Sequence, residues 1–303
     1  MEYRTLGNSG LKVSLLGYGA WALGKKGWPG VDEREAAATL EECLRQGITL
    51  FDTAPVYGFG RSEKLLGEAL RGCRTRVLIA TKCGLRWDKS GRVTHDLSRE
   101  AVLRDIEESL GRLNTGYIDL YQTHWPDPAT PLEETLETLS GLVAQGMVRH
   151  IGLCNVTAPM IEQALRHTGI ASVQNQYNLL QRDAEQDVLP CCRTNGIGFL
   201  CYSPLAQGML AGSFSESFVP GRHDIRRLNP LFRDAEALRD ALAAVRRLPH
   251  PPAAAALRFL AEQPGVSSIL VSMTRRKHLQ ENISALEGVD TPERIKNGLK
   301  LIE

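Results

Sequence analysis

The sequence predicts an α/β protein: a single (β/α)8 TIM barrel over residues 1–303, with an N-terminal hairpin and a C-terminal helix. Short apolar runs alternate with longer segments of helical periodicity, and eight such units fill the chain. The first barrel strand reads LLGYGAW, without the third glycine and the helix start of a dinucleotide-binding fingerprint. An open, doubly wound sheet is therefore disfavoured, and closure into a barrel is expected.

Each element follows from a local pattern. A hairpin of Tyr3–Thr5 with Lys12–Ser14 is expected to plug the barrel floor. Apolar runs predict eight strands at Leu15–Gly19, Ile48–Thr53, Val77–Thr81, Ile118–His124, Val148–Cys154, Ser172–Tyr177, Gly198–Ser203 and Ser267–Val271. Caps and 3.6-residue spacing predict helices at Asp32–Gln46, Ser62–Leu70, Ser98–Leu113, Pro131–Gln145, Thr157–His167, Ala184–Asn195 and Arg275–Leu286.

Three segments depart from this rhythm. Gly212–Leu231 lacks periodicity and is rich in Gly, Ser and Pro, which is typical of a functional lid. The prolines of Arg246–Pro252 predict an abrupt corner between two helices, in a segment that looks short. Glu293–Leu301 predicts a terminal helix across one barrel mouth.

Composition narrows the function. A net charge of +1 argues against a nucleic-acid or membrane-surface partner, because such binding needs a strong basic excess. Seven cysteines, an odd number without zinc-site spacing, indicate a reducing compartment and no metal site. With no signal peptide and no long apolar run, we expect a cytoplasmic protein, monomeric or weakly homo-oligomeric, that acts on a small molecule.

Chemistry is expected where strands end, because barrel enzymes carry their active sites at that face. Asp52, Lys82 and His124 end three consecutive strands, and Tyr57 follows in the next turn. Lys82, anchored by Asp52, would lower the pKa of Tyr57. His124 would orient a carbonyl oxygen, and Tyr57 would protonate it while a hydride reaches the carbon. A hydride donor implies a nicotinamide, because no side chain can supply one.

These residues lie in a pattern that resembles the aldo-keto reductase family. The matching runs are GITLFDTAPVYG, IATK, LYQTHWPDP, IGLCN, VQNQYN and YSPLAQGMLAG. The resemblance implies an NADP(H)-dependent oxidoreductase with Asp52, Tyr57, Lys82 and His124 as its catalytic tetrad. It also implies cofactor contacts from Ala20, Trp21, Asp52, Asn155, Gln174, Tyr202, Ser203, Leu205, Gly208, Ser272, Arg275, His278, Glu281 and Asn282.

Within this resemblance the chain departs from the usual pattern in two places. Cys154 stands where the family usually has serine, which weakens one expected contact to the nicotinamide carboxamide. Near the adenosine end, the segment from Val271 to Thr274 lacks the family's usual Pro-Lys or Pro-Gly pair, and His278 stands where many members have arginine. The 2′-phosphate of NADP(H) would then be recognised by Ser272, Thr274 and Arg275, with His278 as an optional further contact. NADP(H) is favoured, with NAD(H) as the alternative. The arginines Arg222, Arg226 and Arg227 of the lid suit the pyrophosphate.

The substrate pocket is expected to include Trp21 and Trp125, and the substrate to be an aldehyde, a ketone or a sugar. Two alternatives stay open. One is a cofactor-binding regulatory subunit resembling the potassium-channel β subunits. The other is a sugar dehydrogenase working in the oxidative direction.

Overall fold

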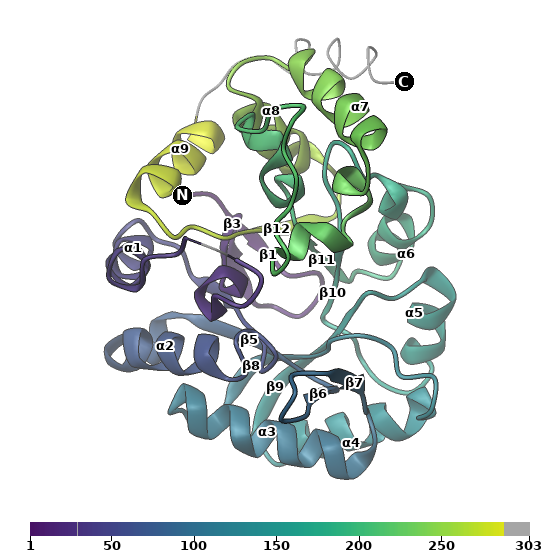
Figure 1. The fold of residues 1–303 in the computed structure, drawn as a ribbon. Coiled ribbons are helices and arrows are strands. Elements are labelled where there is room, and N and C mark those ends of the chain that lie inside the picture. Colours follow the sequence, from purple (N-terminus) through teal and green to yellow (C-terminus); the bar gives the residue numbers. More distant parts are fainter. Residues whose placement is uncertain (29, 288–303) are drawn as a thin grey trace.

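The computed structural model describes residues 1–28 and 30–287, and within them eight parallel strands close into a barrel surrounded by helices (Figure 1). The strands neighbour one another in the order β10-β11-β12-β3-β4-β5-β8-β9. The predicted fold class is confirmed, and every predicted strand is found within two residues of its expected ends. They are β3 Leu16–Gly19, β4 Leu50–Asp52, β5 Leu78–Cys83, β8 Ile118–Thr123, β9 Val148–Cys154, β10 Ser172–Gln176, β11 Gly198–Tyr202 and β12 Val266–Val271.

The helices follow the predicted caps closely. Asp32 begins the first, since its carboxylate accepts a hydrogen bond from the Glu35 backbone N–H at 2.9 Å. The α-helices are α1 Glu33–Arg45, α2 Arg61–Leu70, α3 Arg99–Leu113, α4 Leu132–Ala144, α5 Ala158–Leu165, α6 Val188–Thr194, α7 Ala235–Arg246, α8 Pro252–Glu262 and α9 Arg276–Glu287. The 3-10 turns are η1 Trp21–Gly24, η2 Arg71–Arg76, η3 Asp183–Glu185, η4 Ala206–Ala211, η5 Ile225–Leu228 and η6 Pro230–Phe232.

One helix prediction is wrong. Ala184–Asn195 is not continuous, because Asp187 leaves helical geometry and its side chain caps a new helix at Val188. The corner at Arg246–Pro252 is confirmed, with α7 ending at Arg246 and α8 beginning at Pro252. The predicted helix Glu293–Leu301 lies outside the described residues. Within residues 1–28 and 30–287, no helix combines the length and apolar character needed to cross a bilayer.

The barrel floor is closed as expected. Strands β1 Tyr3–Thr5 and β2 Lys12–Ser14 form the antiparallel hairpin. Leu6 and Val13 from this hairpin pack against an apolar layer inside the barrel. That layer comes from five strands and consists of Leu50, Ala80, Leu120, Leu200 and Leu270.

The same layer determines where polar side chains gather. Side chains alternate between the two faces of a strand. The residues two positions after those of the apolar layer therefore also point into the barrel and lie nearer the carboxyl ends of the strands. Those positions are Asp52, Lys82, Gln122, Tyr202 and Ser272. A buried apolar floor therefore carries a polar layer directly above it, at the mouth where strands end.

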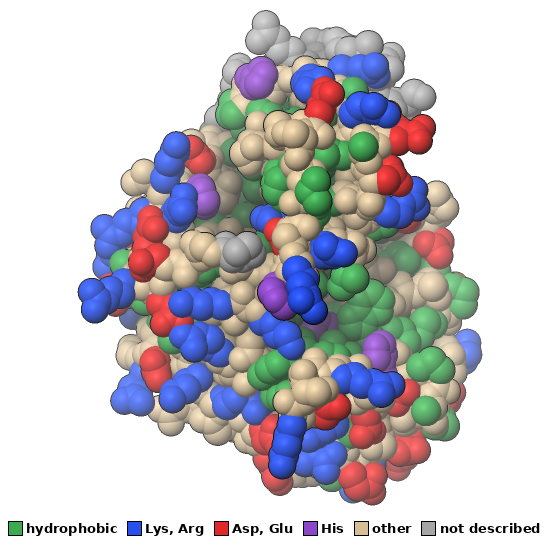
Figure 2. Space-filling view, viewed as in Figure 1, with side chains coloured by type: hydrophobic (Ala, Val, Ile, Leu, Met, Phe, Trp, Pro, Cys, Tyr) green, Lys and Arg blue, Asp and Glu red, His purple; other side chains and the backbone are tan. Residues whose placement is uncertain are grey.

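Two structures cover this mouth. Strands β6 Leu85–Trp87 and β7 Val93–His95 form a hairpin that the sequence analysis did not predict. The predicted lid Gly212–Leu231 contains η5 and most of η6, and the Ile225 N–H donates to the Gly27 carbonyl at 3.1 Å. The lid is thus tied to the loop after β3. Figure 2, from the side of Figure 1, shows the surface hollowed near its centre, with acidic and basic side chains mixed over α1 and α2.

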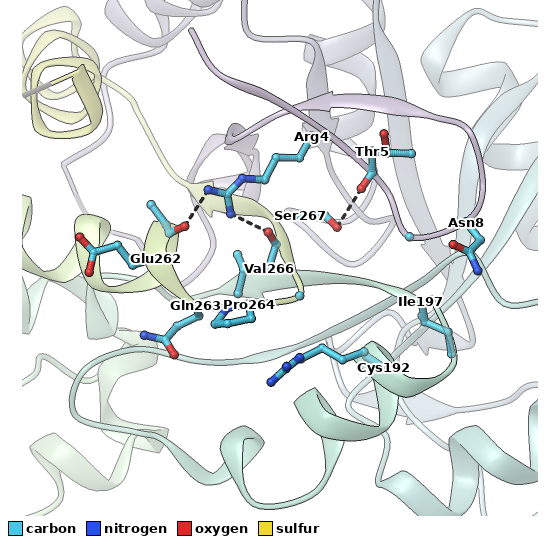
Figure 3. A pocket seen from close by; sticks show the side chains of 15 residues that line it. Arg4, Thr5, Asn8, Cys192, Ile197, Glu262, Gln263, Pro264, Val266 and Ser267 are labelled. Carbon is cyan, nitrogen blue, oxygen red and sulfur yellow. Dashed lines mark hydrogen bonds between the residues drawn. The ribbon is translucent and has the colours of Figure 1, made fainter. Parts of the chain in front are cut away.

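The opposite end of the barrel carries a separate surface hollow (Figure 3). Its lining comes from the N-terminal hairpin, from the end of α6 and the turn before β11, and from the end of α8 and the start of β12. The Arg4 guanidinium there donates to the carbonyls of Val266 and Ala261 at 2.8 and 2.7 Å. Arg4 thereby fixes the hairpin to the barrel, and this hollow lies away from the polar layer.

Candidate active site

A buried ion pair forms the base of the site. Lys82 Nζ lies 2.7 Å from Asp52 Oδ1, with side-chain exposures of 1% and 4%. The ammonium also donates to the Thr53 carbonyl at 2.8 Å. Burial by itself lowers the pKa of Lys82, but the Asp52 carboxylate opposes this and the net pKa is raised. Lys82 therefore stays cationic at neutral pH.

Tyr57 sits above this pair. It follows β4 in a turn, and its hydroxyl oxygen lies 3.4 Å from Lys82 Nζ. Burial raises the pKa of Tyr57 to about 12, while Lys82 acts in the other direction. Lys82 lowers the pKa of Tyr57 as expected, but removal from water outweighs the neighbouring ammonium and the net pKa is raised. The phenol keeps its proton at neutral pH.

His124 completes the predicted set. It directly follows β8 and is buried, and its ring meets the Tyr57 ring edge-on with centroids 5.7 Å apart. Burial, assisted by the Lys82 charge, lowers the pKa of His124 well below its usual value. A neutral imidazole has one N–H donor, so His124 is suited to donate a hydrogen bond to an oxygen atom of a substrate. The structure thus brings all four residues together.

Sequence analysis missed Gln122. This fully buried amide donates from Nε2 to Asp52 Oδ2 at 3.2 Å. Gln174 donates to the same oxygen at 2.8 Å and to Gln122 Oε1 at 3.2 Å, and Cys154 Sγ lies 3.6 Å from Gln122 Oε1. The available signal was an amide residue two positions before His124, near the end of a fully buried strand. The two amides fix the carboxylate that anchors Lys82.

Asn155 and Tyr202 lie beside this network, at the ends of β9 and β11, which flank β10 in the barrel. Asn155 has a left-handed backbone, φ 57°, which asparagine tolerates better than most residues. Its Nδ2 donates to the His124 carbonyl at 2.8 Å, and its Oδ1 accepts from the Tyr202 hydroxyl at 2.8 Å. Asn155 thereby joins the ends of β8, β9 and β11.

The turn after β11 has an unusual backbone. Ser203, Ala206, Gln207 and Gly208 all have positive φ, from 47° to 96°. Backbones that turn this way form concave sets of N–H groups that bind anions. The Arg226 guanidinium of the lid donates to the Gln207 carbonyl at 3.0 Å and closes the lid onto this turn.

The lid arginines differ in their surroundings. Arg226 pairs with Asp224 at 2.7 Å and lies over the Trp28 and Phe214 rings, 5.2 and 5.3 Å from their centroids. Its charge is thus paired with a carboxylate of the lid itself, and its role as an anion ligand stays a prediction. Arg222 and Arg227 are exposed.

The residues expected at the adenosine end lie after β12 and on α9. Ser272 donates to the Gly19 carbonyl at 2.8 Å, and Arg275 Nε lies 3.7 Å from Glu35 Oε2 on α1. His278 and Glu281 are exposed, whereas Asn282 is buried. They form a surface around the start of α9.

Two predicted aromatic residues differ in placement. Trp21 stacks on Tyr57 with centroids 5.9 Å apart and meets the Trp28 edge at 5.3 Å. Trp125 is 41% exposed. Ala20 is buried beneath Trp21, and its N–H donates to the Asp52 carbonyl at 2.8 Å. The wall of the site beside Tyr57 is therefore formed by Trp21.

A sequence model described as the aldo/keto reductase family matches residues 15–298. The chain belongs to this family. Aldo-keto reductase YhdN of Bacillus subtilis is 36% identical over 298 residues, which cover 95% of this chain and 89% of that protein. The NADH-specific methylglyoxal reductase of Escherichia coli is 34% identical over 305 residues, with 94% of each chain covered.

Two further similarities bear on function. A probable voltage-gated potassium channel subunit beta of Oryza sativa is 33% identical over 324 residues, covering 97% of this chain and 94% of that protein. The structure of a glycerol dehydrogenase of Gluconobacter oxydans superposes with a TM-score of 0.88 at 29% identity, covering 99% of this chain and 94% of the other. This aldo-keto reductase thus has enzymes and a channel subunit among its relatives.

Proposed function

We propose that this aldo-keto reductase transfers a hydride between NADP(H) and the carbonyl or alcohol of a small aldehyde, ketone or sugar, with Tyr57 as general acid–base. The observation that carries this proposal is the buried pair Asp52–Lys82 in contact with the half-buried Tyr57, with His124 edge-on to the phenol. Each of these groups lies within contact of the next, at the mouth where barrel enzymes act.

The donor set fits a nicotinamide dinucleotide. Asn155, Gln174 and Tyr202 offer amide groups and an aromatic ring at one side of the mouth, which suits a flat ring with a carboxamide. The positive-φ turn after β11 suits a pyrophosphate. A bound nicotinamide would supply the hydride that the chain itself lacks. NAD(H) remains the alternative to NADP(H).

The protein's own residues account for the remaining steps. Neutral His124 would donate a hydrogen bond to the carbonyl oxygen and orient it. Tyr57 would give its proton to that oxygen, and the Lys82 ammonium would stabilise the phenolate left behind. Asp52, held by Gln122 and Gln174, keeps Lys82 in place. Trp21 would exclude water from one side.

Two relatives support a small, oxygen-rich substrate, since one is called a methylglyoxal reductase and the other a glycerol dehydrogenase. The similarity to a potassium channel subunit beta supports a regulatory alternative. The complete tetrad favours catalysis over that alternative, because a sensor that only binds cofactor has no need of a proton donor held beside a buried lysine. Seven unpaired thiols fit a reducing compartment, and we place the enzyme in the cytoplasm.

Tyr57→Phe tests the proposal. We expect carbonyl reduction to fall by roughly 10²–10⁴-fold, the usual contribution of a general acid, while the dinucleotide Kd from tryptophan fluorescence stays unchanged. Tyr3→Phe is the matched control, because Tyr3 donates to the Gly47 carbonyl far from the tetrad. Aldehydes, diketones and aldoses would serve as substrates. A Tyr57→Phe enzyme that keeps most of its rate would refute the proton-donor role.

A further inference from the structure

The start of α9 faces an acidic residue that sequence analysis did not connect with it. Glu35, in the first turn of α1, places Oε2 3.7 Å from Arg275 Nε. Figure 1 shows α9 next to α1 at the same side of the barrel. Both side chains are half exposed, at 47% and 56%, so a ligand can reach the pair.

Arg275 and Arg276 are both exposed cations at the start of α9, and Arg275 is the one that lies beside Glu35. Ser272 is neutral, and Lys277 is paired with Glu281 at 3.7 Å. His278 is exposed at its surface, yet partial removal of its ring from water, with help from Arg275 and Lys277, holds its pKa below the ordinary value despite Glu281 and Glu35, so the ring is neutral at pH 7. A phosphate bound to Arg275 would therefore share its guanidinium with a carboxylate.

We propose that Glu35 is a specificity-determining residue that keeps the preference for NADP(H) over NAD(H) low. A carboxylate accepts hydrogen bonds from a ribose hydroxyl, whereas it repels a 2′-phosphate bound at the same guanidinium. An arginine beside a carboxylate thus accommodates both dinucleotides. This inference rests on the proposed function, because it concerns the cofactor of that same site.

A purely structural role for Glu35 gives a different expectation. An acid in the first turn stabilises a helix through its dipole, and Asp32 and Glu33 also lie there. Loss of that role would lower thermal stability and would leave the ratio of the two dinucleotide affinities unchanged. The capping bond to Asp32 uses the Glu35 backbone, so a side-chain substitution preserves it.

The test compares Glu35→Gln with Glu41→Gln, which removes the same charge from an exposed position further along α1. Tryptophan fluorescence titration gives the Kd of NADPH and NADH for each protein, and calorimetry gives the Kd of adenosine 2′,5′-bisphosphate. We expect Glu35→Gln to bind NADPH and the bisphosphate about tenfold more tightly, as expected for loss of one repelling charge. NADH affinity should stay equal or weaken slightly, and Glu41→Gln should match the wild type.

The outcomes separate the two proposals. If Glu35→Gln changes the two dinucleotides equally, or changes neither, the specificity role is wrong while the enzyme function stands. If the wild-type protein binds neither dinucleotide, the proposed function is wrong and this inference fails with it. If Glu41→Gln shifts the ratio as strongly as Glu35→Gln, general charge rather than the Arg275 contact is responsible.

Discussion

The Asp52–Lys82 pair should be strongly coupled in stability, and a double-mutant cycle can measure that coupling. The perturbations are Lys82→Met, Asp52→Asn and the two together. Lys82→Met leaves Asp52 with only the amide donors of Gln122 and Gln174, both on Oδ2. Asp52→Asn leaves a buried ammonium with the Thr53 carbonyl and the Tyr57 hydroxyl. Each single variant therefore has an uncompensated buried charge.

The size of the effect follows from distance and burial. Two unit charges 2.7 Å apart attract by about 6 kcal/mol at an effective dielectric of ~20. Removing either partner of such a buried pair costs about 3–5 kcal/mol, whereas replacing both by neutral groups costs much less. We expect the double variant to lose only ~1–3 kcal/mol, so the coupling energy, which is the sum of the two single losses minus the double loss, should be about 6 kcal/mol.

The assay is urea unfolding at pH 7, followed by tryptophan fluorescence and far-ultraviolet circular dichroism. If the two probes give the same transition for each variant, unfolding is two-state and the unfolding free energies of the variants can be compared with that of the wild type. All three variants should lose carbonyl reduction, including the well-folded double variant. If the losses of the single variants simply add, the ammonium and the carboxylate do not interact as described, and the electrostatic basis of the site is wrong.

Three further predictions address the surroundings of this pair. The pKa of Tyr57 is about 12, and alcohol oxidation needs the phenolate form of this residue. The rate of alcohol oxidation should therefore rise about tenfold per unit of pH between about 7 and 10, while the rate of carbonyl reduction stays level. A plateau of the oxidation rate below about pH 9 would contradict the raised pKa. Gln122→Leu removes a hydrogen-bond donor to Asp52 and should lower the unfolding free energy by about 1–3 kcal/mol. Gln280→Leu, at an exposed position, is the control. An unchanged urea midpoint for Gln122→Leu would exclude a role of Gln122 in holding Asp52. Arg226→Met should free the lid from Gln207 and Asp224 and speed cleavage of the lid by trypsin. If Arg226→Met and the control variant Arg227→Met are cleaved at the same rate, the contacts of Arg226 do not hold the lid.

The sequence by itself determined the barrel and the position of its chemistry. Strand period, caps and glycine ends are local signals, and they placed all eight strands within two residues. Asp52, Lys82 and His124 could be found because each ends a buried strand, where an ionisable residue needs a partner. Parallel strands bring their carboxyl ends to one mouth, so the order of the strands was enough to group these residues.

Only the tertiary structure decided how strongly these groups interact. The pKa of Tyr57 depends on a balance between burial and the Lys82 charge, and that balance has no sequence signature. Gln122 became part of the site, Arg226 turned inward to Asp224, and Glu35 reached Arg275, through contacts between distant segments. Periodicity depends on residues that are close in sequence. The desolvation of buried groups and the Coulomb energy between charges depend on distances that are set only when the chain folds.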